Sequence, residues 1–232
     1  MQYVLAPPPR PGLPVLGTDR LFPIRRVYCV GRNYAEHARE MGHDPSREAP
    51  FFFQKNPDNL VTTGRFPYPP GSSDVHFEVE LVVALAAGGR DIAEADALAT
   101  VFGYAVGLDM TRRDVQAEAK RMGRPWEAGK AFEASAPCSP IAAAASIGHP
   151  ARGLIALDVN GTPRQRGDLA DMIWPVAGII AQASRLFELA AGDLIFTGTP
   201  AGVGPISVGD RLACMIAGVG RLDVEVTPDG RG

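Results

Sequence analysis

Residues 75–85 read VHFEVELVVAL, an alternation that is typical of a β-strand. Every second residue of this stretch is apolar, from Val75 to Leu85. In its first half the residues between them are polar: His76, Glu78 and Glu80. Because successive side chains of a strand point to opposite faces of a sheet, the spacing predicts a strand with one buried face.

Other short apolar segments surround this strand along the chain. Residues 26–30, 51–53 and 102–108 are further candidates for strands, and apolar runs follow Gly-Asp pairs within residues 191–198 and 208–218. We expect one long helix, at residues 174–189, and shorter helices at 33–42, 92–100 and 111–121. Short strands in the majority, few helices and no regular β-α rhythm favour an α+β fold that is mainly β.

The composition is that of a folded, mildly acidic protein. Of the 232 residues 46% are hydrophobic, which is enough for a substantial core and argues against a disordered chain. Lys and Arg number 23 and Asp and Glu 26, so the net charge is −3, and no basic run is long enough to follow a nucleic-acid backbone. We therefore expect no nucleic-acid partner.

Cysteine usage and the lack of targeting patterns point to the cytoplasm. The 3 cysteines are widely spaced among apolar or small neighbours, which is typical of buried thiols in a reducing compartment. No stretch approaches the roughly 18 apolar residues of a membrane span, and the N-terminus lacks the pattern of a signal peptide. We expect a cytoplasmic protein with no membrane partner.

Prolines divide the chain into an arm and a body. Five of them between positions 7 and 14 each remove an amide donor and fix φ, which favours an extended chain. We expect residues 1–21 to form a proline-rich N-terminal arm and residues 22–232 a single domain.

Three carboxylates stand where predicted strands could bring them together. Glu78 and Glu80 are two residues apart, so on a strand they would share a face at roughly 6 to 7 Å. Asp109 directly follows the apolar run at 102–108. Such carboxylates repel one another unless a cation neutralises them, and oxygen ligands suit Mg²⁺, Mn²⁺ or Ca²⁺ better than zinc. The alternative is the exposed polar face of an amphipathic strand.

His37 and Glu40 lie three residues apart on the predicted short helix. At this spacing the carboxylate could hold the imidazole in one orientation, and the pair could act as a general base on water. The alternative is an incidental pair on a surface helix.

Two further segments carry less specific signals. Lys130 lies between Gly129 and two apolar residues, so it is either buried with an anionic partner or extended to solvent. Residues 197–200, TGTP, form either a tight turn that faces an anion or a plain connector.

Five blocks of sequence carry a resemblance to a known family. In order they are YCVGRNYAEHAREMG, HFEVELVV, GYAVGLDMTRRDVQ, GRPWEAGKAF and GDLIFTGTPAGVGP. From about residue 22 to the C-terminus the chain resembles the fumarylacetoacetate hydrolase superfamily, and within it the acylpyruvate hydrolases, such as the fumarylpyruvate hydrolases of gentisate breakdown. The proline-rich arm is not part of this resemblance.

The resemblance implies a fold, a cofactor and an activity. The fold would be built around a rolled mixed β-sheet, in a homodimer, with Mg²⁺ or Mn²⁺ held by Glu78, Glu80 and Asp109. The activity would be hydrolysis of the C–C bond of acylpyruvates, which are 2,4-diketo acids, and for fumarylpyruvate the products are fumarate and pyruvate. The partner would be a small oxo-acid substrate.

The resemblance also implies roles for other side chains. His37 and Glu40 match the catalytic dyad of the family, and Lys130 and Gln116 match residues that contact the substrate or polarise the attacked carbonyl. The positions that match the lining of the substrate pocket are Arg32, Lys55, Arg113 and Thr199. Family members commonly have Pro directly after this lysine, whereas Asn56 follows Lys55 here.

Two other kinds of function remain open. The same metal and enolate chemistry would serve oxaloacetate decarboxylation, or isomerisation of a 2-hydroxyhepta-2,4-diene-1,7-dioate. A non-enzymatic binding module would leave the carboxylates as solvated surface.

Overall fold

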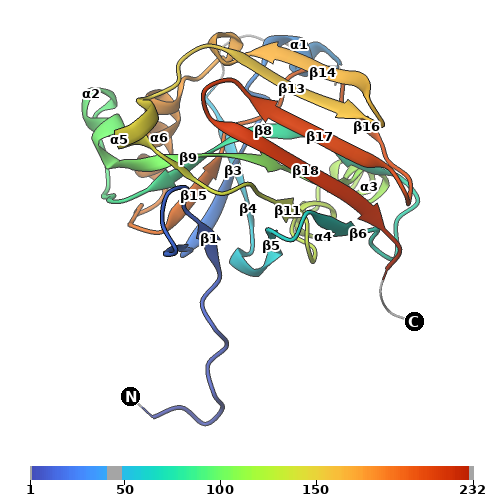
Figure 1. The fold of residues 1–232 in the computed structure, drawn as a ribbon, viewed down its shortest axis with the longest axis horizontal. Coiled ribbons are helices and arrows are strands. Elements are labelled where there is room, and N and C mark those ends of the chain that lie inside the picture. Colours follow the sequence, from blue (N-terminus) through green and yellow to red (C-terminus); the bar gives the residue numbers. More distant parts are fainter. Residues whose placement is uncertain (1, 41–48, 230–232) are drawn as a thin grey trace.

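Two stacked β-sheets make up most of the molecule (Figure 1). The computed structural model describes residues 2–40 and 49–229, and only the backbone of residues 38 and 40. In these ranges the helices are short and the strands predominate, so the expected α+β, mainly β architecture is confirmed.

The six-stranded sheet lies between two hydrophobic clusters. Its order is β12 (Ala142–Ala143), β9 (Val101–Leu108), β8 (Val79–Leu85), β15 (Asp193–Phe196), β3 (Arg26–Gly31) and β4 (Phe51–Lys55). Neighbouring strands are antiparallel except β15 and β3, which are parallel. Three apolar runs that are far apart in the sequence, residues 26–30, 51–53 and 102–108, therefore belong to one sheet.

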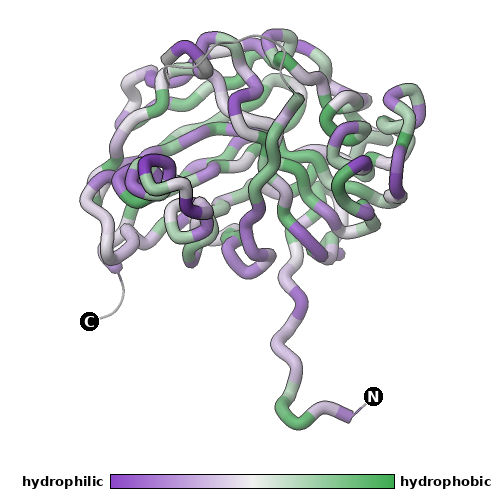
Figure 2. The backbone as a smooth tube through the Cα atoms, turned by 180° about the vertical axis from the view of Figure 1, so that it is seen from behind, coloured by the Kyte–Doolittle hydropathy of each residue, from purple (hydrophilic) through white to green (hydrophobic). Residues whose placement is uncertain are grey.

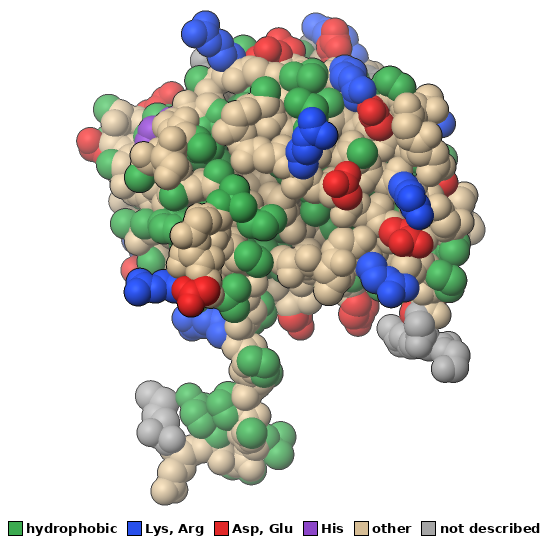
Figure 3. Space-filling view, viewed as in Figure 1, with side chains coloured by type: hydrophobic (Ala, Val, Ile, Leu, Met, Phe, Trp, Pro, Cys, Tyr) green, Lys and Arg blue, Asp and Glu red, His purple; other side chains and the backbone are tan. Residues whose placement is uncertain are grey.

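The five-stranded sheet covers one face of this layer. Its order is β14 (Thr162–Asp168), β13 (Leu154–Val159), β17 (Arg211–Ile216), β18 (Gly220–Thr227) and β6 (Arg65–Pro67). Along β17 and β18 buried residues mostly alternate with exposed ones. Figure 3 shows acidic and basic side chains interspersed over the side where these strands run, so the outer face of this sheet meets solvent.

Short elements make up the rest of the described molecule. Three small sheets consist of β1 (Gly12–Pro14) with β2 (Leu21–Pro23), of β5 (Leu60–Val61) with β11 (Ala136–Pro137), and of β10 (Thr111–Arg112), β7 (Val75–Phe77) and β16 (Gly204–Pro205). The α-helices are α1 (Ala35–Glu40), α2 (Glu94–Ala97), α3 (Arg113–Arg121), α4 (Glu127–Lys130), α5 (Ala144–Ile147) and α6 (Val176–Leu186). The 3₁₀ turns are η1 (Pro57–Asn59), η2 (Leu98–Thr100) and η3 (Leu169–Asp171).

The helices differ from the predicted ranges at their ends. The long helix is α6, which is shorter than the predicted 174–189, and the predicted helix 92–100 is divided into α2 and η2. The end of the helix predicted at 33–42 lies outside the described residues. Among the helices of the described ranges, none combines the length and the apolar character that crossing a membrane requires.

The strand β8 is buried on both faces, so the predicted single buried face is wrong. All seven of its residues are buried. Leu81 and Val83 belong to the core between the two large sheets, whereas Val82 and Ala84 pack on the opposite side against residues that include Leu13. Figure 2 shows hydrophobic chain gathered in the middle of the molecule, where these strands run. The second face is covered because the N-terminal segment folds back onto it.

The predicted strand 75–85 is interrupted at Glu78. Residues before it form β7, which pairs with β10 and β16, and residues after it form β8 in the six-stranded sheet. The backbone carbonyl of Glu78 accepts a hydrogen bond from the amide of Asp109, 2.9 Å away. The chain therefore passes from one sheet to another at a carboxylate of the predicted metal site.

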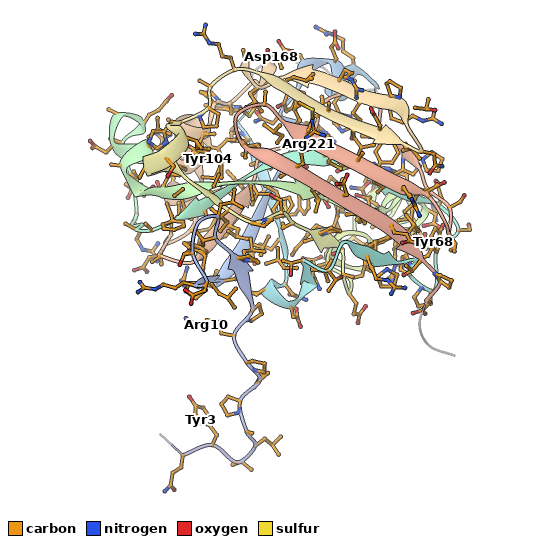
Figure 4. All side chains as sticks on the ribbon, in the orientation of Figure 1. Tyr3, Arg10, Tyr68, Tyr104, Asp168 and Arg221 are labelled. Atoms are coloured by element: carbon orange, nitrogen blue, oxygen red, sulfur yellow. The ribbon has the colours of Figure 1, made fainter. Side chains whose placement is uncertain are left out.

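The body of the protein begins earlier than the predicted boundary at residue 22. Leu13 is fully buried, and β1, which contains it, pairs with β2. Only the residues before this strand extend away from the body, and Figure 4 shows Tyr3 and Arg10 on that projecting part. Leu13 packs inward because Gly12 and Leu13 form a short non-proline segment, which can pair with β2.

Candidate active site

Three carboxylates meet where β8 and β9 lie side by side. Glu78 precedes β8, Glu80 belongs to it, and Asp109 follows β9. The antiparallel register pairs Val79 with Leu108, which brings the flanking acidic residues together. One oxygen from each carboxylate lies within 4.8 Å of the other two. We call these three residues the carboxylate cluster.

Lys130 neutralises part of the carboxylate cluster. Its ammonium donates hydrogen bonds of 2.7 Å to Glu78 Oε2, Asp109 Oδ2 and Thr111 Oγ1. These three acceptors use all three of its N–H donors. Lys130 is buried, so the sequence alternative of a lysine extended to solvent does not apply.

Lys55 lies on the other oxygen of Asp109. Its ammonium is 2.9 Å from Asp109 Oδ1, donates to the carbonyl of Met110 at 3.3 Å, and also donates to the carbonyl of Lys130. Its side chain is fully buried. Lys55 therefore contacts a carboxylate of the cluster and the backbone of Lys130 together.

Burial and neighbouring charges shift the pKa values of the two glutamates in opposite directions. Burial, with the charges of Asp109 and Glu78, raises the pKa of Glu80 well above its usual value. Burial acts on Glu78 in the same sense, but the charges of Lys130 and Arg113 outweigh it and hold the pKa of Glu78 below its usual value. Glu80 is thus the member whose negative charge is least compensated.

The carboxylate cluster fits a hard divalent metal ion. Its ligands are all oxygens, the donor type preferred by Mg²⁺ and Mn²⁺. Asp109 Oδ1 is buried and accepts no hydrogen bond of acceptable geometry, although the Lys55 ammonium is close to it. Glu80 Oε2 accepts a hydrogen bond of 2.7 Å from the amide of Gly198, which fixes the orientation of the Glu80 carboxylate. Among the described residues no cation forms an ion pair with Glu80, so a dication between these groups would neutralise the charge of that carboxylate.

One cavity collects most of the residues singled out in the sequence. It is lined by the carboxylate cluster together with Arg32, His37, Arg113, Gln116, Lys130 and Thr199. Lys55 is not among its lining residues, because it lies on the far side of Asp109. The side chain of Glu40 lies outside the described residues, although its backbone belongs to α1.

Arg113 and Gln116 are positioned together by the first turn of α3. Arg113 Nη1 donates to Gln116 Oε1 at 2.7 Å, and Arg113 Nη2 donates to Glu78 Oε1 at 2.5 Å. Because the carbonyl oxygen of Gln116 is occupied by Arg113, its NH₂ group is left to donate to a molecule in the cavity.

Residues 197–200 form no tight turn, but the amide of Gly198 faces the carboxylate cluster and donates to Glu80. Gly198 has φ 95°, and a Cβ there would lie 2.7 Å from the Cβ of Asn33, so only glycine fits without movement. Thr199 Oγ1 accepts from Gln165 Nε2 at 2.8 Å. The side chain of Asn33, the first residue of the predicted helix 33–42, donates to the carbonyl of Thr197 at 2.8 Å.

Several residues of the site carry no signal that the sequence reasoning used. Gln165 reaches Thr199 from the five-stranded sheet, and nothing in the local pattern of β14 distinguishes it from an exposed residue. The cavity is also lined by the side chains of Phe51, Phe53, Lys120 and Trp126. Phe51 and Phe53 were expected only as strand residues, and Trp126 only as part of the block GRPWEAGKAF.

The sequence matches proteins of one family. Residues 26–227 match the family model described as fumarylacetoacetate (FAA) hydrolase C-terminal. The chain is 42% identical over 186 residues to fumarylpyruvate hydrolase of Ralstonia sp, across 80% of this chain and 96% of that protein. It is also 42% identical over 200 residues to oxaloacetate tautomerase YcgM of Escherichia coli (strain K12), across 85% and 90%.

The fold matches a solved structure along almost its whole length. A crystal structure of fumarylpyruvate hydrolase from Pseudomonas aeruginosa, in complex with Mn²⁺ and pyruvate, has a TM-score of 0.96 and 50% sequence identity. The match covers 98% of this chain and 100% of that one. Sequence and fold thus relate the chain to the same group of enzymes.

Proposed function

The chain belongs to the fumarylacetoacetate hydrolase family, and we propose that it hydrolyses a C–C bond of acylpyruvates, converting fumarylpyruvate to fumarate and pyruvate. One observation carries the proposal: the carboxylate cluster, His37, Gln116 and Lys130 line one cavity. The pyruvate bound to the Pseudomonas aeruginosa enzyme supports it, since pyruvate is the product that all acylpyruvates share.

The carboxylate cluster would hold Mg²⁺ or Mn²⁺. When bound, the ion would accept the oxygens of the oxo-acid end of the substrate as ligands, and its positive charge would offset the negative charge of the departing enolate. Lys55 would act from behind Asp109 and keep its carboxylate in place. Arg113 would hold Glu78 and orient Gln116.

His37 would start the reaction by taking a proton from water. Glu40, one helical turn later on α1, would orient the imidazole. Hydroxide would then attack the C4 carbonyl of the diketo acid, which gives a tetrahedral alkoxide.

Lys130 and Gln116 would stabilise this alkoxide by hydrogen bonds. Lys130 would do so by exchanging one of its three protein acceptors for the new oxyanion, whereas the NH₂ group of Gln116 is already available. Collapse of the alkoxide breaks the C3–C4 bond, releases the acyl group as a carboxylic acid, and leaves the enolate of pyruvate. The enolate would take up the proton that His37 removed from water, which restores the base.

The test is release of pyruvate from defined substrates. Purified protein supplied with Mn²⁺ or Mg²⁺ is expected to release pyruvate from fumarylpyruvate and from acetylpyruvate, measured by a coupled lactate dehydrogenase assay. No pyruvate with either ion would contradict the proposal, provided that circular dichroism shows a folded protein.

Chemistry on oxaloacetate is the second candidate. The 42% identity to the oxaloacetate tautomerase of Escherichia coli favours it, and a decarboxylase or an isomerase of hydroxydienedioates would use the same metal site. Rates with oxaloacetate and fumarylpyruvate, measured side by side, separate these functions. Faster conversion of oxaloacetate, with dominant CO₂ release or dominant tautomerisation, would displace the hydrolase.

We also propose that the protein is a homodimer in the cytoplasm. The resemblance to the family supports the first statement, and three buried free thiols support the second. Light scattering that gives the mass of one chain would contradict the dimer.

A further inference from the structure

Two cations rest on two aromatic rings inside the same cavity. The guanidinium of Arg32 lies 5.3 Å from the ring centre of Phe51, and the ammonium of Lys120 lies 5.0 Å from that of Trp126. The two rings meet edge to face with 5.4 Å between their centres. All four residues line the cavity, and we call them the aromatic group.

No carboxylate of a described side chain neutralises the two cations of the aromatic group. Among the side chains described at 2–37, 39 and 49–229, no ion pair within 4.0 Å involves Arg32 or Lys120. Lys120 is only partly exposed, and burial, with the positive charges of Arg113 and Arg32, lowers the pKa of its ammonium below the usual value. The described residues thus gather positive charge at a partly desolvated place, and none of them forms an ion pair with it there.

The charges of the whole cavity indicate which anion is missing. Among the described lining residues, four cations face the three carboxylates of the cluster, so their net charge is +1, and a divalent metal raises it to +3. Arg113 and Lys130 are already bound to the cluster, whereas Arg32 and Lys120 are not. The uncompensated charge is therefore in the aromatic group, away from the ligands that would hold the oxo-acid end of a substrate.

We propose that Lys120 and Arg32, mounted on Trp126 and Phe51, bind a second carboxylate at the end of the acyl chain. The substrates are then dianions, in which one carboxylate belongs to the pyruvate end and the other ends the acyl group. This inference rests on the proposed acylpyruvate activity and specifies its substrate class.

A cation–aromatic contact could by itself hold each cation in place. Such contacts contribute about 0.5–2 kcal/mol, which is enough to orient a side chain. In that case the aromatic group would not affect which acyl chain is accepted. Comparison of two substrates distinguishes this structural role from binding of a carboxylate.

The test compares two substrates that differ in the acyl end. Fumarylpyruvate ends in a carboxylate and acetylpyruvate ends in a methyl group. For Lys120→Gln we expect kcat/KM with fumarylpyruvate to fall by about 10- to 100-fold, the usual loss for a hydrogen bond to a charged group, and kcat/KM with acetylpyruvate to change by less than about twofold. Lys120→Arg should retain most of the activity with fumarylpyruvate.

Arg121→Gln is the matched control. It removes the same charge from the neighbouring, exposed position of α3 and should leave both substrates unaffected. Equal losses on the two substrates in Lys120→Gln would overturn the inference, because Lys120 would then act through the common machinery. Unchanged rates on both would overturn it as well.

A binding measurement keeps the inference testable if the proposed activity fails. Calorimetry on the Mn²⁺-supplied protein would follow fumarate, which carries the acyl-end carboxylate, and oxalate, which resembles the oxo-acid end. Lys120→Gln should weaken binding of fumarate by about tenfold or more and leave oxalate unchanged. If only the proposed hydrolase activity is wrong, the wild-type protein will release no pyruvate but will bind fumarate more tightly than Lys120→Gln does. Fumarate binding equal in wild type and variant would refute the aromatic group as an anion site.

Discussion

The carboxylate cluster and the aromatic group line one cavity, but their charges are balanced in different ways. In the cluster, Lys130 and Arg113 contact Glu78, and Lys55 and Lys130 contact Asp109. All of these residues are buried except Arg113, which is partly buried. In the aromatic group, cations lie on rings and meet no acid of the described chain. Substitutions in the cluster should therefore change stability and metal binding, whereas those in the aromatic group should change only the choice of substrate.

The largest effect is expected from Glu80→Gln, which removes a charge from the cluster. The variant keeps an oxygen for the Gly198 amide but loses a metal ligand, so turnover should fall by at least about 10⁴-fold and calorimetry should detect no Mn²⁺ binding. Glu118→Gln, on the exposed side of α3, is the control. Wild-type Mn²⁺ affinity in Glu80→Gln would show that the cluster is not the metal site.

His37→Ala should separate catalysis from metal binding. We expect pyruvate release to fall by about 10²- to 10⁴-fold, the usual range for loss of a general base, while Mn²⁺ affinity stays the same. His149→Ala is the control, since His149 bonds Tyr104 outside this cavity. Unaltered turnover in His37→Ala would remove the dyad from the mechanism.

Lys55→Met tests whether a residue behind the cluster supports it. The substitution leaves Asp109 without one of its two cations and removes a donor from the carbonyls of Met110 and Lys130, of which the second keeps a hydrogen bond from Ser135 Oγ. We expect Mn²⁺ affinity to fall by about 10- to 100-fold and the melting temperature to drop. Arg65→Met, which removes an exposed cation from β6, should do neither. A variant with normal affinity would exclude a positioning role for Lys55.

The smallest effect is a difference in pH dependence between substrates. Burial, Arg113 and Arg32 lower the pKa of Lys120, with Lys130 acting in the same sense and Glu78 opposing them. Since only the ammonium form attracts a carboxylate, KM for fumarylpyruvate should rise severalfold as the pH passes upward through this lowered pKa. KM for acetylpyruvate should not rise over the same pH range. The same alkaline rise for both substrates would contradict the assignment.

The sequence was informative where local rules decide the structure. A carboxylate placed directly after a buried strand, as Asp109 is, lies at a sheet edge whatever the rest of the fold does. The position of Glu78 was not predicted by the alternation of apolar residues at 75–85. The chain passes from one sheet to another at Glu78 instead of continuing as one strand. The convergence of the two glutamates was expected, but the geometry that produces it was not.

Contacts between distant segments could not be predicted from one sequence. Gln165 reaches Thr199 only because the two large sheets stack, and Lys120 meets Trp126 only because the chain turns back between α3 and α4. The second buried face of β8 depends on Leu13, which the proline pattern assigned to the arm. Each of these contacts depends on tertiary packing, which periodicity does not record.

The ammonium of Lys55 makes two parts of the site a single thermodynamic unit. It contacts Asp109 and also the backbone carbonyl of Lys130. The ammonium of Lys130 in turn donates a hydrogen bond to Asp109. Free-energy changes caused by substituting residues 55 and 130 should consequently not add, and a double-mutant cycle between them should yield a coupling energy well above that of independent sites. Across evolution the two lysines are then expected to be kept or replaced together.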